Sequence, residues 1–190
     1  MSESFRDRAN VPVLETARLT LRPHRLADFE ASFSMWSDPI VTRHIGGKPS
    51  TEQQTWSRLM GYVGHWSLLG FGYWVLEEKT TGSFLGELGF ANFRRDIAPS
   101  MKSAPELGWA LASRFHGQGY ATEAVGAAVA WGDARFGAAR TVCLINAANV
   151  ASIRVAQKCG YVEFERTLFN EQPTLFLARE TFHGPLHSEE

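Results

Sequence analysis

The sequence has few cysteines, no excess of either charge and no clear membrane span. Its two cysteines, Cys143 and Cys159, form no Cys-x-x-Cys pair and have no histidine at metal-ligand spacing, so we expect neither a disulfide nor a metal site. Lys and Arg number 19 against 20 Asp and Glu, which gives a formal net charge of −1. This balance disfavours binding to nucleic acid or to an anionic membrane surface.

One charge-free stretch is long enough to be tested as a membrane span. Residues 59–76 contain no Asp, Glu, Lys or Arg over eighteen positions, close to the ~20 residues that cross a bilayer. Four glycines, His65 and Ser67 interrupt it, which instead predicts a helix end, a Leu-Gly-Phe-Gly turn and a strand. Residues 1–10 lack the apolar stretch of a secretory signal. We therefore expect a cytoplasmic protein with no membrane and no nucleic acid among its partners.

Length and composition predict one globular domain. The chain has 190 residues, of which 44% are hydrophobic and 21% charged, and no repeat or linker divides it. We expect a single domain over residues 14–181, an N-terminal extension over residues 1–13 and a C-terminal tail over residues 182–190.

Hydrophobic periodicity predicts an α+β class, a mixed sheet with helices on its faces. The first third is predicted as a strand over residues 18–22, a helix over residues 28–38 that stops before Pro39, and a second helix that Ser50 opens with Gln53 at capping-box spacing.

The rest of the chain alternates strands with two more helices. The predicted elements are strands 73–77 and 84–90 joined by the hairpin turn 79–82, a polar loop 92–104, a strand 106–111, a helix that contains residues 124–136, a strand 141–145, a helix that Asn149 opens and Gly160 ends, and strands 161–165 and 174–178.

The most informative stretch runs from Glu106 to Glu123, where a strand leads through an Arg-x-x-Gly-x-Gly loop into a helix. Arg114, Gly117 and Gly119 form the pattern. Free backbone N–H groups at a helix N-terminus attract anions, and glycines allow phosphate a close approach. The glycines could equally form only a tight connection. The loop lacks the Lys-Ser/Thr of a nucleoside-triphosphate loop and the third glycine of a dinucleotide fingerprint, which disfavours ATP and NAD.

Several motifs together resemble the GNAT acetyltransferases, and within them the RimJ/RimL-like branch. The likeness covers about residues 14–180 and is carried by Glu15–Pro23, Ser37-Asp38-Pro39, Gly70–Trp74, the Arg-x-x-Gly-x-Gly loop, Asn149–Arg154 and Gly160-Tyr161. It implies the GNAT fold, with a central, mostly antiparallel twisted sheet of six to seven strands and about four flanking helices.

The resemblance implies acetyl-CoA as acyl donor and an amine as acceptor, with no metal. By motif position, the pyrophosphate site comprises Gly117, Gln118, Gly119, Tyr120, Ala121 and Thr122, with Arg114 in the same loop. The pantetheine arm is expected to add as a strand along the splayed edge of Trp109, Ala110 and Leu111, whose N–H groups could polarise the thioester carbonyl. Asn149 is expected to reach this arm, and is equally expected as a plain helix cap.

Amine acetylation needs a neutral amine and a proton for the thiolate. Glu106, acting through water, is the first candidate base, and Glu87 on the preceding strand is the alternative. If both carboxylates face one cleft, their repulsion would raise one pKa; either could instead be a solvated carboxylate. Many relatives carry a tyrosine seven positions after Asn149, but this chain has Ala156. Ser152 is the substitute acid, and could instead bond only to its own backbone.

Three other residues have expected roles outside proton transfer. His116 adjoins the glycine loop and is expected to orient the turn rather than act as a base. Phe71 and Tyr73 could wall an acceptor pocket.

Two functions follow from these residues. The first is direct N-acetyl transfer, without an acyl-enzyme, to a primary amine of a protein N-terminus or a small molecule. The second is a non-catalytic acyl-CoA sensor, which the missing tyrosine favours. We expect either a monomer or a homodimer.

Overall fold

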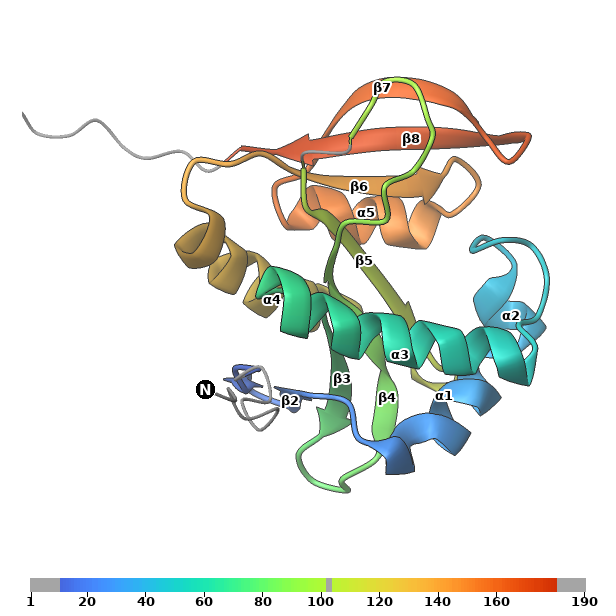
Figure 1. Cartoon of the computed structure of the whole chain (residues 1–190), viewed down its shortest axis with the longest axis vertical. Helices are drawn as coiled ribbons and strands as arrows, with labels where there is room; N and C mark the ends of the chain where they lie inside the picture. Colours follow the sequence, from blue (N-terminus) through green and yellow to red (C-terminus); the bar gives the residue numbers. More distant parts are fainter. Residues whose placement is uncertain (1–10, 102–103, 181–190) are drawn as a thin grey trace, which may run out of the picture.

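The computed structural model describes residues 11–101 and 104–180, which form an eight-stranded sheet with the order β1-β2-β3-β4-β5-β6-β8-β7. The elements in chain order are β1 (Leu14–Glu15), β2 (Leu19–Arg22), the 3-10 turn η1 (Leu26–Asp28), α1 (Phe29–Trp36), α2 (Pro39–Thr42), α3 (Glu52–Leu69), β3 (Tyr73–Glu78), β4 (Phe84–Ala91), β5 (Glu106–Leu111), the 3-10 turn η2 (Ser113–Phe115), α4 (Tyr120–Phe136), β6 (Thr141–Asn146), α5 (Val150–Lys158), β7 (Val162–Phe169) and β8 (Gln172–Arg179) (Figure 1).

This architecture confirms the predicted mixed, mostly antiparallel sheet. The described part of the chain has one more strand than the six to seven expected, and five helices rather than four. The two-residue β1 and the four-residue α2 are too short for hydrophobic periodicity to reveal. The predicted N-terminal extension and C-terminal tail lie almost wholly outside the described residues.

The start of α3 corrects one prediction. Thr51, rather than Ser50, caps this helix: its Oγ1 accepts from the Gln54 N–H at 3.2 Å, and the Gln54 side chain accepts from the Thr51 N–H. Both serine and threonine have a glutamine three positions later, so the sequence pattern fits either. The structure selects Thr51 because the Ser50 N–H donates to the Trp36 carbonyl at 2.9 Å, which holds Ser50 against the end of α1.

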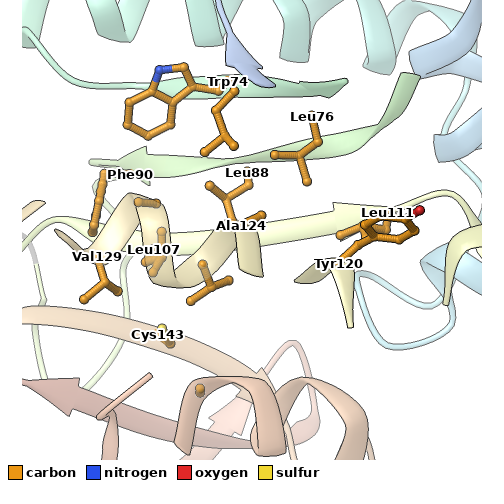
Figure 2. Packing of buried hydrophobic residues seen from close by; sticks show 14 of the residues in the cluster. Trp74, Leu76, Leu88, Phe90, Leu107, Leu111, Tyr120, Ala124, Val129 and Cys143 are labelled. Carbon is orange, nitrogen blue, oxygen red and sulfur yellow. The ribbon is translucent and has the colours of Figure 1, made fainter. Parts of the chain in front are cut away.

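The main core lies between α4 and one face of the sheet (Figure 2). Trp74, Leu88 and Leu107 lie on three adjacent strands and are at most 2% exposed. The small residues of α4 allow the helix to approach closely; a Cβ at Gly132 would lie 2.8 Å from the ring of Phe90. The burial of these side chains stabilises the layer by about 1.5–3 kcal/mol for each large residue.

The charge-free stretch forms no membrane span. α3 ends at Leu69, Gly70 follows with φ +70°, and β3 begins at Tyr73, as the helix-turn-strand interpretation predicts. Among the helices of the described residues, none has the length and apolar character needed to cross a membrane.

The sheet opens between β5 and β6, the only parallel neighbours in the described part of the chain. They pair at a single position, Glu106 with Val142, supported by a Val142 N–H to Pro105 carbonyl bond of 3.1 Å. Beyond it β5 stays paired with β4 and β6 with β8. Figure 1 shows β5 turning away from β6, β7 and β8 toward the other half of the molecule. Beyond this pair, one edge of β5 therefore has no strand beside it among the described residues.

Candidate active site

A cavity of about 600 Å³ adjoins this opening. Its walls come from β5 and β6, the start of α5, the α2–α3 connection, α3, β3, the loop before β5 and the β7–β8 hairpin. Of the residues predicted for catalysis or cofactor binding, it brings together Glu106, Trp109, Asn149 and Ser152. Glu87 and the glycine loop do not line it.

The unpaired edge of β5 offers backbone groups at alternate residues. The Pro105 carbonyl bonds to β6 and the Ala112 N–H bonds to β4, so regular alternation directs the N–H and C=O groups of Leu107, Trp109 and Leu111 away from β4. Trp109 and Leu111, which lie beyond the single pair with β6, are thus placed as predicted.

Ala110 corrects the prediction for this edge. Its carbonyl oxygen lies beside β4, 2.2 Å from where a Cβ of Gly86 would stand, so its backbone groups belong to the β4–β5 ladder. Its side chain is buried against Met35, Trp36 and Val41. The backbone N–H and C=O groups of adjacent strand residues point to opposite edges of the strand, so three consecutive residues cannot all present these groups to the opening.

His116 orients the turn after β5, as expected. Its Nε2 lies 2.8 Å from the Leu111 carbonyl oxygen, which leaves the Leu111 N–H available at the open edge.

The glycine loop adopts the backbone that its pattern predicts. Gly117 and Gly119 have φ of +74° and +80°, and Gly119 is the N-cap of α4. Among the described residues no side chain caps this helix, and its first internal bond is from the Glu123 N–H to the Gly119 carbonyl. Gln118 fixes the loop by donating to the Arg114 carbonyl at 2.9 Å. Free N–H groups at the start of a long helix suit a phosphate or diphosphate.

Arg18 supplies a cation beside this loop that the sequence interpretation missed. Its guanidinium lies 4.2 Å from the centre of the Tyr120 ring and donates to the Gln118 carbonyl at 3.0 Å. It also pairs with Glu123 at 2.7 Å. Burial raises the pKa of Glu123, but hydrogen bonds from Thr16 and Arg18 outweigh it and lower the pKa overall. Arg18 is part of the Glu15–Pro23 motif, but the sequence gives no local sign of its partners, which lie about 100 residues further along the chain. Arg114, in contrast, is exposed, with its guanidinium 4.6 Å from the Phe115 ring centre.

Glu106 lies on the cavity wall, 8% exposed, and is paired with a residue that the sequence did not single out. Arg95 donates to both of its oxygens, at 2.8 and 2.9 Å. Burial lowers the pKa of Arg95, but the hydrogen bond and charge of Glu106 raise it above its usual value. Each carboxylate oxygen can accept a second hydrogen bond, so Glu106 can still bind a water molecule from the cavity.

Glu87 does not behave as the predicted alternative base. It is 1% exposed and accepts from the Ser32 hydroxyl at 2.6 Å and from the Trp36 indole at 2.8 Å, with His24 Nε2 at 3.5 Å. Burial alone would raise the pKa of Glu87, but the His24 ring and these donors hold it below its usual value. The condition for mutual repulsion, that Glu87 and Glu106 face one cleft, is not met, because Glu106 lines the cavity and Glu87 does not.

Strand register gives the physical reason. Glu87 is opposite Ala110, whereas Glu106 is opposite Ala91. The two carboxylates are therefore four positions apart along the strands, or about 13 Å at ~3.3 Å per residue. Glu87 anchors α1 to the sheet and has no access to the cavity.

Asn149 and Ser152 both lie at the start of α5 on the cavity wall. Asn149 is the helix cap, since its Oδ1 accepts from the Ser152 N–H at 3.2 Å. The Ser152 hydroxyl has no partner within residues 11–101 and 104–180, so it is not held by its own backbone. Ala156 is fully buried one turn further on.

Two stacked tyrosines form another wall. Tyr62 and Tyr73 have ring centres 4.2 Å apart, and burial raises the pKa of both phenols, which keeps them neutral. A Cβ at Gly108 would lie 2.2 Å from the Tyr73 hydroxyl oxygen. A glycine within a strand is the sequence signal of such a close approach. Tyr73 therefore lines the cavity as expected, whereas Phe71 packs against Phe136.

The described residues contain no group of three or more His, Cys, Asp or Glu side chains that could hold a metal ion.

Known proteins resemble this chain over most of its length. Residues 18–162 match the family model described as an acetyltransferase (GNAT) domain. An FsC-acetyl coenzyme A-N(2)-transacetylase from Aspergillus fumigatus is 32% identical over 173 residues, which cover 86% of this chain and 70% of that protein. The structure of an acetyltransferase from Agrobacterium tumefaciens strain C58 superimposes with a TM-score of 0.77 and 26% identity, over 95% of this chain and 99% of the other.

The comparisons do not assign the chain to the RimJ/RimL-like branch. A structure described as RimL, a ribosomal L7/L12 alpha-N-protein acetyltransferase, has a TM-score of 0.71 at 17% identity, over 90% of this chain and 95% of the other, a likeness of fold alone. The family match, in contrast, spans most of the chain together with the open strand edge and the uncapped helix. The chain belongs to the GNAT acetyltransferase domain family and is an acyltransferase.

Proposed function

We propose that the protein transfers an acetyl group from acetyl-CoA directly to a primary amine. One observation supports this most strongly: the unpaired edge of β5 leads from the uncapped N-terminus of α4 into the cavity that holds Glu106 and Ser152. The glycine loop follows the C-terminal end of β5, and the cavity begins at Trp109. A ligand with a diphosphate at one end and a reactive group at the other fits this order.

The residues present fit acetyl-CoA. The backbone N–H groups of residues 117–122 would hold the diphosphate with Arg18 beside them, and Trp109 and Leu111 would bond the amides of the pantetheine arm, with Asn149 opposite. When bound, acetyl-CoA supplies the acetyl group as an activated thioester.

The chain's own groups then have distinct roles. Glu106 removes the amine proton through a bound water molecule, because its oxygens keep acceptor capacity beside Arg95. The Trp109 N–H stabilises the thioester oxygen as charge develops on it. The Ser152 hydroxyl returns a proton to the sulfur. No cysteine lines the cavity among the described residues, which favours transfer without an acyl-enzyme.

Release of the CoA thiol tests this proposal. Release should require both acetyl-CoA and an amine, and the intact protein mass should show no acetylated intermediate. Glu106→Gln and Ser152→Ala should each lower kcat by about 10²–10⁴, the range for loss of a general acid or base, with unchanged acetyl-CoA affinity. A trapped acetyl-protein, or kcat unchanged in both variants, would contradict the mechanism.

Ala156 and the Arg95 contact to Glu106 favour a second function, an acyl-CoA-binding sensor. Calorimetry distinguishes the two. Tight acetyl-CoA binding with no transfer to any amine, unchanged in Glu106→Gln and Ser152→Ala, would support the sensor.

The acceptor of the proposed reaction is a protein α-amino group or a small amine. The likeness to RimL is one of fold, so it does not choose between them.

A further inference from the structure

The lining of the cavity is rich in positive charge. Arg43, Arg58 and Arg95 line it, and Glu106 is the only acidic residue among its described lining residues. Three arginines against one glutamate leave a formal surplus of two positive charges. The whole chain, in contrast, has a net charge of −1, so the surplus is local.

Two of these arginines have no acidic partner in the part of the chain that the structure describes. Arg95 pairs with Glu106, but within residues 11–101 and 104–180 neither Arg43 nor Arg58 forms an ion pair. Arg58 is half-buried. A partly desolvated cation without a counter-charge is unfavourable unless an anion binds to it.

The structure holds Arg58 in place. Its guanidinium lies 3.8 Å from the centre of the Trp36 ring, and its Nη1 is 3.3 Å from the Ser50 hydroxyl oxygen. A side chain fixed in this way loses little conformational entropy when it binds a ligand.

The two arginines are not placed to hold the diphosphate. Arg58 is on α3 and Arg43 follows α2, whereas the glycine loop does not line the cavity and has Arg18 as its own cation. The stacked Tyr62 and Tyr73 rings extend the same wall as Arg58.

We propose that the acceptor is a primary amine whose carrier bears a carboxylate, bound by Arg58 and Arg43 while the amine lies toward Glu106. This inference rests on the proposed acetyl transfer and names its substrate class. The arginines attract a carboxylate through charge-assisted hydrogen bonds, and they repel a polycationic amine. The apolar tyrosine wall suits the carbon chain that links the two groups.

The test compares acceptors that differ only in the carboxylate. The pairs are β-alanine with β-alaninamide, and a peptide amide beginning Ser-Asp with one beginning Ser-Asn; spermidine is the polycation. Rates are compared at equal concentrations of neutral amine. We expect kcat/KM to be about 10- to 100-fold higher for the carboxylate in at least one pair, the effect of one or two charge-assisted bonds. The pair that responds distinguishes a small acid from a peptide.

Arginine variants test whether Arg58 and Arg43 cause the preference for the carboxylate. Arg58→Met and Arg43→Met should each lower kcat/KM for the carboxylate acceptor more than kcat/KM for its amide, and so reduce the preference for the carboxylate. Arg58→Lys should retain part of it. Arg140→Met, at an exposed arginine that does not line the cavity, is the matched control and should leave the preference intact.

The outcomes separate the two proposals. Three results would overturn the carboxylate assignment while acetyl transfer stands. They are equal rates within both pairs, acetylation of spermidine faster than that of the carboxylate acceptors, and a preference that survives in both Arg58→Met and Arg43→Met. Transfer to none of the amines would overturn the proposed function itself, and this inference with it.

Discussion

Gly108 decides how closely Tyr73 can approach β5. A Cβ at this position would lie 2.2 Å from the Tyr73 hydroxyl oxygen but 3.5 Å from the ring carbon that carries it. The ring cannot easily move away, because it is 6% exposed and stacked on Tyr62. We therefore expect Gly108→Ala to lower the free energy of unfolding by about 1–3 kcal/mol, the usual effect of overpacking.

Removal of the hydroxyl should relieve this penalty. Within the described residues the Tyr73 hydroxyl has no hydrogen-bond partner, so Tyr73→Phe alone should change stability by less than about 1 kcal/mol. In that background the alanine methyl at position 108 meets only the ring carbon, at an ordinary contact distance. Replacing glycine in a strand also favours folding by roughly 0.5–1 kcal/mol. The two changes should therefore be coupled by about 1–3 kcal/mol.

Urea unfolding of the wild type, both single variants and the double variant measures this coupling. Gly86→Ala is the control, because its Cβ would meet the backbone oxygen of Ala110 at 2.2 Å, a clash that Tyr73→Phe cannot relieve. A coupling energy within about 0.5 kcal/mol of zero at position 108 would refute the reasoning, since independent sites are additive to that level.

Three further predictions follow from individual residues. Gly119→Val forces a β-branched residue to φ +80° and should weaken acetyl-CoA binding by about tenfold or more in calorimetry, whereas Gly126→Ala, in open space on α4, should not. Glu87→Gln should lower the free energy of unfolding by about 1–3 kcal/mol at pH 7. Because folding lowers the pKa of Glu87, the stability that its carboxylate contributes is complete above the unfolded pKa of about 4.3 and is lost as the pH falls through the folded pKa. Urea unfolding from pH 7 to 3 should therefore show a smaller acid-dependent loss of stability in the variant than in the wild type. Thr51→Ala should lower the free energy of unfolding by about 1 kcal/mol through loss of the helix cap, and Ser50→Ala by less than half of that; the reverse order would restore the sequence-based assignment.

The sequence predicts the strands and the longer helices because their periodicity is local. The alternation in Glu106–Leu111 and the Asn149 to Gly160 helix signals need no distant partner, and both elements form as expected. The start of α3 was misplaced because a distant backbone bond, from Ser50 to Trp36, decides between two equal local patterns.

The candidate site was predictable only in part, for the same reason. The residue type allows the positive φ that Gly117 and Gly119 adopt. The ion pairs of Arg18 with Glu123 and of Arg95 with Glu106 depend on which strands and loops meet in space. Their sequence separation gives no local signal, so one cation beside the loop and one beside the candidate base were missed.

Glu87 and Glu106 show why register matters more than residue type in choosing the base. Both are acidic residues on adjacent strands, and both are at least nine-tenths buried. Glu87 accepts from a serine and an indole beside a histidine, away from the cavity, so a water molecule cannot reach it without displacing α1. Glu106 has a single cation beside it and opens onto the cavity. Access to the cavity and unused acceptor capacity therefore favour Glu106 over Glu87 as the proposed base.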